Sequence, residues 1–405
     1  MTTTSNGPLE ARRPDSGTRR LRASGCRIED LVALLRQQTD LSAYPHAARV
    51  TGQVLIYDAD ALRPLTDDED NVDALSAELI AALTGGPGVV VFENAFPDHA
   101  VVDRVTAAFT GIIAEEEEAG GLSGDHFAPP GANSRVWNAL EKLAVRDPEA
   151  FVDYYANDII ALVSNAWLGP GYQVTSQVNV VRPGGKAQDP HRDYHLGFLG
   201  NDVVEQYPAH VHRLSPVLTL QGAVAHSDMP LESGPTLYLP YSHQYLPGYL
   251  AWRLPEFREH FATHHVQLPL RKGDAAFFNP AVFHGAGSNV TADVHRVANL
   301  LQVSSAFGRA MEYVDRAKVS MAVYPTLQQR QAAGADPVGL TRALAVAAEG
   351  YPFPTNLDLD QPIGGLTPLG QVDLLTQALA ENWEPARVAA ALDAYGVRRS
   401  NRNIR

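Results

Sequence analysis

The chain has 405 residues, 45% of them hydrophobic, and its 46 acidic and 32 basic residues give a net charge of -14. This length can bury at least one large core, whereas the acidic balance argues against a protein built to bind a nucleic-acid backbone. The single cysteine, Cys26, excludes an internal disulfide and any cysteine-based zinc or iron–sulfur site. No apolar run reaches the roughly eighteen residues of a membrane span, and no apolar stretch follows the N-terminal arginines. We therefore expect a cytoplasmic protein.

The first 84 residues are predicted to lie outside the main domain. Residues 1–26 are rich in Ser, Thr, Gly and Arg, a composition typical of a disordered head. Residues 27–84 are predicted to form a helical extension. Within it, apolar residues at helical spacing predict a helix over 27–38, and a second predicted helix ends at Gly85. The acidic stretch 58–73 between them is interpreted as a solvated linker or helix start.

Residues 85–309 are predicted to form the main domain. The segment 87–96, PGVVVFENAF, is typical of a buried strand, and helices are expected over 99–121 and 147–166. Between 173 and 305, short β-branched and aromatic runs alternate with Pro, Gly, Asn and Asp turns. This pattern predicts six to eight strands, and hence a mainly β core that is a sandwich or a jelly roll with flanking helices.

Residues 310–405 are predicted to be a helical extension that packs on the core. A proline-rich bridge over 351–368 leads to two segments with apolar residues at helical spacing, 371–383 and 385–395. Four arginines close the chain, and we interpret them as a solvated tail rather than a contact for nucleic acid.

The segment DPHRD, residues 189–193, carries the first candidate metal ligands. His191 and Asp193 are two residues apart, so on an extended chain their side chains lie on the same side. The run GDAAFFNPAVFHG offers a third ligand, because it reads as a buried strand that ends in His284. Two histidines and one carboxylate form the facial triad of non-haem Fe(II) oxygenases, which leaves positions open for a cosubstrate and O₂.

Arg296 lies twelve residues after His284, in an apolar run that reads as the neighbouring strand. A strand that folds back would bring this guanidinium near the metal, and a buried guanidinium suits a carboxylate. The run itself holds no acidic residue, and the nearest acid, Asp293, lies in the preceding turn. A ligand anion is therefore the expected partner. 2-Oxoglutarate fits, because its 2-oxo acid would chelate the metal while its far carboxylate pairs with Arg296.

These motifs resemble the phytanoyl-CoA dioxygenase family of Fe(II)- and 2-oxoglutarate-dependent oxygenases. The resemblance spans roughly 85–305 and rests on HRDYHLGF (191–198), ESGPTLYLPYSHQ (232–244) and GDAAFFNPAVFHGAGSN (273–289) leading to Arg296. It implies a double-stranded β-helix, the jelly-roll or cupin-like core. It also implies metal ligation by His191, Asp193 and His284, and 2-oxoglutarate binding by Arg296.

Other residues are candidates for binding the cosubstrate or the substrate. Gln177 and Asn179 share one face of a predicted strand, and the resemblance implies that one of these amides, Gln177 before Asn179, contacts 2-oxoglutarate. Many family members carry Ser or Thr two residues after the distal histidine. That residue is Ala286 here, so Ser288 and Thr236 are candidates to replace the hydroxyl. Candidates for the substrate pocket, with a surface helix start or core packing as alternative roles, are Arg135, Trp137, Asn138, Tyr194 and Phe198.

We therefore predict an Fe(II)- and 2-oxoglutarate-dependent dioxygenase that uses O₂ to hydroxylate an unactivated C–H bond of a small molecule, releasing succinate and CO₂. Asp193 disfavours halogenation, whereas desaturation, epimerisation and ring formation stay open. Two alternatives belong to other classes: a metal- or small-molecule-binding jelly roll without oxygenase activity, and a cupin-type isomerase or decarboxylase. The first has no need of Arg296, and the second usually shows more histidines and a glutamate. The expected partner is a small molecule, without nucleic acid or membrane.

Overall fold

The computed structural model describes residues 20–120 and 133–400. The strands in these ranges form one eight-stranded sheet, in the order β1-β2-β3-β9-β6-β11-β5-β4, and one three-stranded sheet, in the order β10-β7-β8. The strands are β1 (Arg49–Thr51), β2 (Val54–Asp58), β3 (Val89–Glu93), β4 (Asn133–Val136), β5 (Gln173–Val181), β6 (Thr219–Ala225), β7 (Thr236–Leu239), β8 (Val266–Gln267), β9 (Ala275–Phe278), β10 (Phe283–Ala286) and β11 (Arg296–Ser304).

The large sheet is mixed, because β2 and β3 run parallel while its other neighbouring pairs run antiparallel. Its two longest strands, β5 and β11, pair over their whole length, with Leu300 opposite Gln177. Side chains alternate between the two faces of a strand. Val174 and Leu301 accordingly point to the helical side, and the even-numbered residues of β11 share the opposite face with Gln177.

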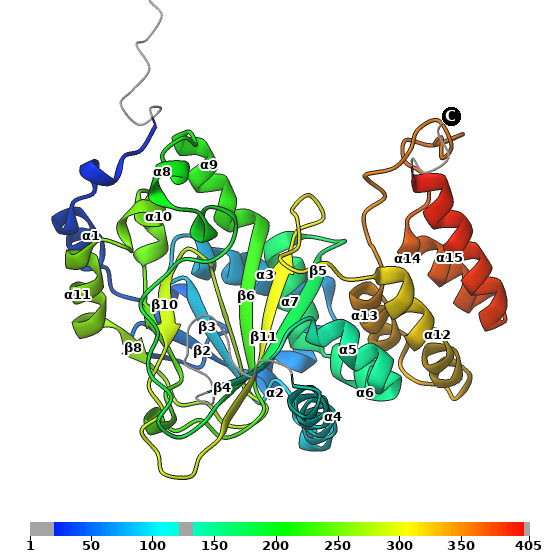
Figure 1. Cartoon of the computed structure of the whole chain (residues 1–405), viewed down its shortest axis with the longest axis horizontal. Coiled ribbons are helices and arrows are strands. Elements are labelled where there is room, and N and C mark those ends of the chain that lie inside the picture. The colour runs from blue at the N-terminus through cyan, green and yellow to red at the C-terminus, as the bar shows by residue number, and fades with distance from the viewer. Residues whose placement is uncertain (1–19, 121–132, 401–405) are drawn as a thin grey trace, which may run out of the picture.

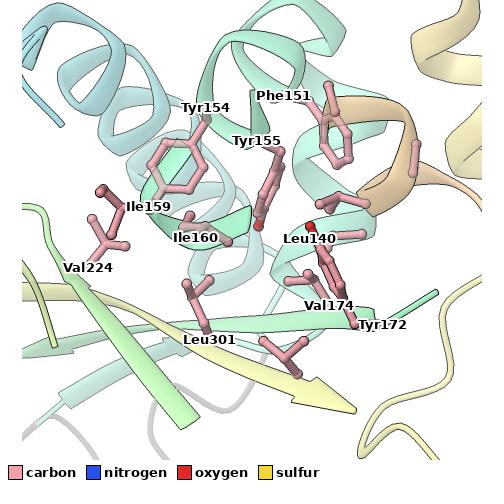
Figure 2. Packing of buried hydrophobic residues seen from close by; sticks show 14 of the residues in the cluster. Leu140, Phe151, Tyr154, Tyr155, Ile159, Ile160, Tyr172, Val174, Val224 and Leu301 are labelled. Atoms are coloured by element: carbon pink, nitrogen blue, oxygen red, sulfur yellow. The ribbon is translucent and has the colours of Figure 1, made fainter. Parts of the chain in front are cut away.

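Helices cover the outer face of the large sheet (Figure 1). Tyr154, Tyr155 and Ile160 pack over Leu301 and Val174 in a continuous hydrophobic core (Figure 2). Each such buried side chain contributes roughly 1.5–3 kcal/mol relative to exposure, so this layer holds the sheet in place. The helices are α1 (Ile28–Leu34), α2 (Ala59–Leu62), α3 (Glu69–Thr84), α4 (His99–Glu118), α5 (Ala139–Arg146), α6 (Pro148–Tyr155), α7 (Asp158–Leu168), α8 (Asn201–Val204), α9 (Ala209–Leu214), α10 (Gly248–Ala251), α11 (Pro255–His264), α12 (Arg316–Ala332), α13 (Pro337–Ala347), α14 (Gln371–Ala380) and α15 (Pro385–Arg399).

The N-terminal part differs from the expected helical extension. The run VLIY forms β2, which pairs with β3 and extends the large sheet. The strand corresponds to a short apolar run between Gly52 and Asp58, which is flanked by segments of helical periodicity. Residues 1–19 of the expected disordered head lie outside the described residues. Cys26, also assigned to that head, is buried in a hydrophobic cluster with Tyr245 and Phe257.

The helical segments before and after the sheet follow the sequence pattern with one difference. The single helix expected over 147–166 is two helices, α6 and α7, because the Asn157 side chain caps a new helix by accepting a hydrogen bond from the Ile160 amide. Beyond β11, α12 contacts α5 and α6, and α14 and α15 lie at the far end of the molecule from α1 (Figure 1). Within the described ranges, no helix has the length and apolar character that crossing a membrane requires.

Candidate active site

Three metal-ligating side chains meet between the two sheets. His191, Asp193 and His284 place one ligand atom each within 4.8 Å of one another. The Nε2 atom of His191 lies 3.7 Å from Asp193 Oδ1, and the Nε2 atom of His284 lies 3.4 Å from Asp193 Oδ2. The fold thus brings together the three residues that the sequence analysis predicted as metal ligands.

The backbone fixes how the two histidines face this point. His191 and His284 form an antiparallel bridge, with amide-to-carbonyl distances of 2.9 and 3.2 Å. Each ring Nδ1 lies beside a carbonyl oxygen, that of Asp189 at 3.0 Å and that of Val282 at 2.9 Å. Since a carbonyl only accepts, each Nδ1 donates, and each Nε2 keeps its lone pair for a metal. This is the usual outer-shell arrangement of metal-binding histidines.

The charge states of the group also suit a metal. Burial opposes ionisation of Asp193, but His191, His284 and a 2.5 Å hydrogen bond from Gln221 together hold the pKa of Asp193 well below its ordinary value. Burial lowers the pKa of His191, which favours the neutral imidazole. An ionised carboxylate beside a neutral imidazole is the protonation state that a divalent metal requires of its ligands.

Arg192 lies between His191 and Asp193 in the sequence and anchors their segment to the backbone around Ser242 and Tyr245. Its guanidinium is buried, donates to the carbonyls of Ser242 at 2.6 Å and Tyr245 at 3.0 Å, and lies between aromatic rings of Tyr249 and Phe283. Burial lowers the pKa of Arg192 to about 10. A Cβ at the neighbouring Gly248 would lie 2.0 Å from the Arg192 guanidinium carbon, so only glycine leaves room for this group.

Arg192→Ala should therefore lower the free energy of unfolding by about 3 kcal/mol, because it leaves buried carbonyls unpaired and opens a cavity. Denaturant unfolding followed by circular dichroism measures this change. The matched control is Arg253→Ala, since Arg253 also contacts carbonyls and the Trp252 ring but is only half-buried. The control should cost less than about 1 kcal/mol. Equal losses in the two variants would contradict an anchoring role for Arg192.

A cavity of about 130 Å³ extends from the three candidate ligands to Arg296. Most of the other predicted site residues line it, namely Arg135, Trp137, Gln177, Asn179, Phe198 and Thr236. Three predicted residues are not among its lining residues. The Asn138 amide bonds Glu141 at 3.2 Å, Tyr194 is buried, and the Ser288 hydroxyl accepts a hydrogen bond from the Ala187 amide.

Several polar atoms of this cavity have no hydrogen-bond partner among the described residues. They are Gln177 Nε2, Asn179 Oδ1, Gln221 Oε1, Arg296 Nε and Gln302 Oε1. A buried polar atom left unpaired costs roughly 1–3 kcal/mol, so the cavity is suited to a polar ligand. Arg296 is only 5% exposed, and no described carboxylate lies within ion-pair distance of it. Burial lowers the pKa of Arg296 to about 10.

Sequence reasoning missed Gln221 and Gln302, which lie opposite each other on β6 and β11. Both side chains are buried and line the cavity. The signal was present as a polar residue within an apolar strand, TLQGAVA for Gln221 and RVANLLQVS for Gln302. The strand sequences alone do not show that the Gln221 amide donates a hydrogen bond to Asp193.

Comparisons with known proteins agree with the motifs. Residues 85–298, more than half of the chain, match the family model described as Phytanoyl-CoA dioxygenase (PhyH). Among solved structures, the non-heme alpha ketoglutarate dependent epimerase SnoN from nogalamycin biosynthesis is 20% identical with a TM-score of 0.38, over 59% of this chain and 84% of that one. AviO1 from Streptomyces viridochromogenes Tue57 is 18% identical with a TM-score of 0.41, over 58% of this chain and 97% of that one.

The carbocyclase SnoK, also from nogalamycin biosynthesis and alpha ketoglutarate dependent, is 20% identical with a TM-score of 0.39, over 62% of this chain and 91% of that one. No curated protein matches the chain. The family model covers the segment that contains His191, Asp193, His284 and Arg296. The chain therefore belongs to the phytanoyl-CoA dioxygenase family of Fe(II)- and 2-oxoglutarate-dependent enzymes.

Proposed function

We propose that this protein is a dioxygenase that hydroxylates an unactivated C–H bond of a small molecule. Family membership and the His–Asp–His group assign Fe(II), 2-oxoglutarate and O₂ as its cofactors. The observation that carries the proposal is the buried Arg296 guanidinium, which lines the same cavity as the three candidate ligands and has no described carboxylate partner. A buried cation of this kind is costly without an anion, and the far carboxylate of 2-oxoglutarate would supply one.

The two sheets are proposed to form a double-stranded β-helix. Two features support this: the inner face of the large sheet bears Gln177 and Gln302, and the small sheet contributes Thr236 and His284 to the same cavity. Residues 85–309 would then be the catalytic domain, with 310–405 as an extension packed on it and 27–84 as an extension that adds β1 and β2 to its large sheet.

The chain's own residues have distinct proposed roles. His191, Asp193 and His284 would hold the metal, and Arg296 would orient the cosubstrate. Iron and 2-oxoglutarate, when bound, supply the oxidising chemistry that forms succinate and CO₂. Gln177 is the first candidate for the cosubstrate amide. Its Oε1 accepts a hydrogen bond from Arg135 at 3.2 Å, so its Nε2 is the end that donates to a carboxylate, and the Glu312 carboxylate already interacts with this amide.

Thr236 is the better candidate for the hydroxyl that Ala286 lacks. The two residues are paired across β7 and β10, so Thr236 lies directly beside the position where the family often has Ser or Thr. Thr236 and Arg296 line the same cavity. Both hydroxyls have a partner, since Ser288 accepts from the Ala187 amide at 2.9 Å and Thr236 interacts with Tyr238, but Ser288 does not line the cavity. We therefore propose that Thr236 contributes to binding of the cosubstrate carboxylate.

Thr236→Val should raise the Kd for 2-oxoglutarate about tenfold, because it removes one hydrogen bond to a charged group worth about 1.5 kcal/mol and keeps the side-chain volume. Ser288→Ala is the matched control and should change this Kd less than about twofold. Anaerobic titration of 2-oxoglutarate into the Fe(II)-loaded proteins compares them. A large effect of Ser288→Ala together with none of Thr236→Val would reverse the assignment.

The substrate is proposed to bind at the open end of the cavity. Trp137 and Phe198 line the cavity and are 36% and 54% exposed, so they offer apolar surface to an incoming molecule. The Arg135 guanidinium lies 4.9 Å from the centre of the Trp137 ring and adds positive charge there. These features support a small organic substrate.

Incubation with a metabolite panel, Fe(II), 2-oxoglutarate and O₂ tests the proposed reaction. Substrate-dependent succinate formation together with a product that has gained one oxygen atom is the expected result. A product that has lost two hydrogens would replace hydroxylation by desaturation or ring formation, and an isomer of unchanged mass would replace it by epimerisation. Bound iron with no succinate formation, even from 2-oxoglutarate alone, would favour a metal-binding protein without oxygenase activity.

A further inference from the structure

We propose that Gln221 is a positioning residue that makes Asp193 bind the metal through one carboxylate oxygen and so keeps a coordination position open for O₂. The inference rests on the proposed function and adds a role for a residue outside the triad. The proposal follows from the position of Gln221 in the sheet, from the direction of its amide, and from the number of coordination positions on the metal.

The sheet holds Gln221 firmly in the site. Strand β6 lies inside the large sheet between β9 and β11, and Gln221 is opposite Phe278 on one neighbour and Gln302 on the other. The next residue, Gly222, lets β6 approach β9 closely, since a Cβ there would lie 2.7 Å from the Phe277 ring. Gln221 itself is only 6% exposed. Its side chain therefore starts from a fixed backbone and reaches a fixed point.

The chemistry of the contact fixes the direction of the amide. Gln221 Nε2 lies 2.5 Å from Asp193 Oδ2. An ionised carboxylate only accepts hydrogen bonds, so the amide nitrogen must face it and Oε1 must point away. Oε1 is indeed buried without a partner among the described residues. The hydrogen bond thus engages Oδ2 of Asp193, which also lies 3.4 Å from His284 Nε2, whereas Oδ1 lies 3.7 Å from His191 Nε2 and receives no described hydrogen bond.

The number of coordination positions on the iron shows why this restraint matters. Iron sites of the facial-triad type are roughly octahedral, so two imidazoles and one carboxylate oxygen leave three positions open. 2-Oxoglutarate takes two of them by chelation, and the third serves O₂. If Asp193 used both oxygens, no position would remain after the cosubstrate had bound. By holding Oδ2, Gln221 opposes the second bond and protects the third position.

Nitric oxide tests the open position without turnover, because it binds Fe(II) where O₂ would. Gln221→Met keeps the side-chain length and removes the hydrogen bond. Its matched control is Gln371→Met, the same substitution at a buried glutamine of α14 that does not line the cavity. In anaerobic protein saturated with Fe(II) and 2-oxoglutarate, the Kd for nitric oxide should rise at least about tenfold for Gln221→Met, in line with losses of outer-shell partners. It should stay within about twofold for Gln371→Met.

Electron paramagnetic resonance of the nitrosyl signal gives the Kd, and thermal unfolding checks that each variant is folded. Gln221→Leu provides a second test if Gln221→Met does not fold, because it also removes the donating nitrogen and leaves no group that can donate to Asp193. It too should lose nitric oxide affinity. Folded variants at Gln221 that bind nitric oxide as tightly as the native protein would overturn the inference. Native protein that binds neither Fe(II) nor 2-oxoglutarate would overturn the proposed function instead.

Discussion

His284→Ala should abolish high-affinity Fe(II) binding, raising the Kd at least about a hundredfold. Metal sites in proteins draw several kcal/mol from each ligand, and this variant leaves only His191 and Asp193. The imidazole of His284 is directed to the site by its Nδ1 contact with the Val282 carbonyl, and no other described histidine or carboxylate belongs to this group of metal-ligand side chains. Anaerobic titration with Fe(II), or the iron content after dialysis, measures the loss.

His264→Ala is the matched control for this experiment. His264 is an exposed residue near the end of α11, where its ring stacks on that of His260. Its removal should leave the Kd for Fe(II) within about twofold of native. If His264→Ala lost iron while His284→Ala kept it, the metal would lie elsewhere and the assignment of the triad would be wrong.

Arg296→Ala should weaken 2-oxoglutarate binding roughly thirty- to several-thousand-fold while Fe(II) binding stays nearly intact. Truncating one partner of a buried, hydrogen-bonded charge pair costs about 2–5 kcal/mol, which converts to this range of Kd. Arg296 is buried and has no described acidic neighbour. Burial lowers the pKa of Arg296, Tyr238 opposes this, and the like charge of Arg135 adds to it, so no carboxylate is among the groups that act on it. We therefore propose that its guanidinium binds a ligand carboxylate.

Two controls make the Arg296 result specific. Arg296→Lys keeps the charge but loses the forked geometry, so its Kd should fall between native and Arg296→Ala. Arg271→Ala removes an exposed arginine from the separate surface groove beside Leu270 and should change nothing. An unchanged 2-oxoglutarate midpoint in Arg296→Ala would make Arg296 a structural residue, and the oxygenase assignment would then rest on the triad alone.

The pairing of His191 with Asp193 was predictable from their short spacing, whereas the approach of His284 was expected from the chemistry of a metal triad and depends on a long-range bridge. His191 and Asp193 are two residues apart on one segment. The single strand expected to end in His284 is two strands in different sheets, β9 and β10, and His284 lies inside β10, where it pairs with His191 through a single bridge. Arg296 was predictable as a buried cation for a similar reason, since it begins a strand with an apolar pattern and no acid. The type of these residues and the alternation of side chains along a strand were therefore enough to predict their roles.

Features that depend on long-range register were not accessible in the same way. Gln221 meets Asp193 across 28 residues of sequence, through the lateral position of β6 in the large sheet. The choice between Thr236 and Ser288 depends on the pairing of β7 with β10, because both hydroxyls are close to Ala286 in principle. The pairing of β2 with β3 depends on the packing of the whole sheet, which local periodicity does not encode.

The most direct test of the central claim is a titration of 2-oxoglutarate into the anaerobic, Fe(II)-loaded native protein, followed by visible absorption. A bidentate 2-oxo acid on Fe(II) produces a metal-to-ligand charge-transfer band. We predict a band that needs both Fe(II) and 2-oxoglutarate, saturates at one cosubstrate per chain, and disappears on exposure to O₂ as succinate forms. Iron that binds at His191, Asp193 and His284 while 2-oxoglutarate leaves the spectrum unchanged would contradict the account.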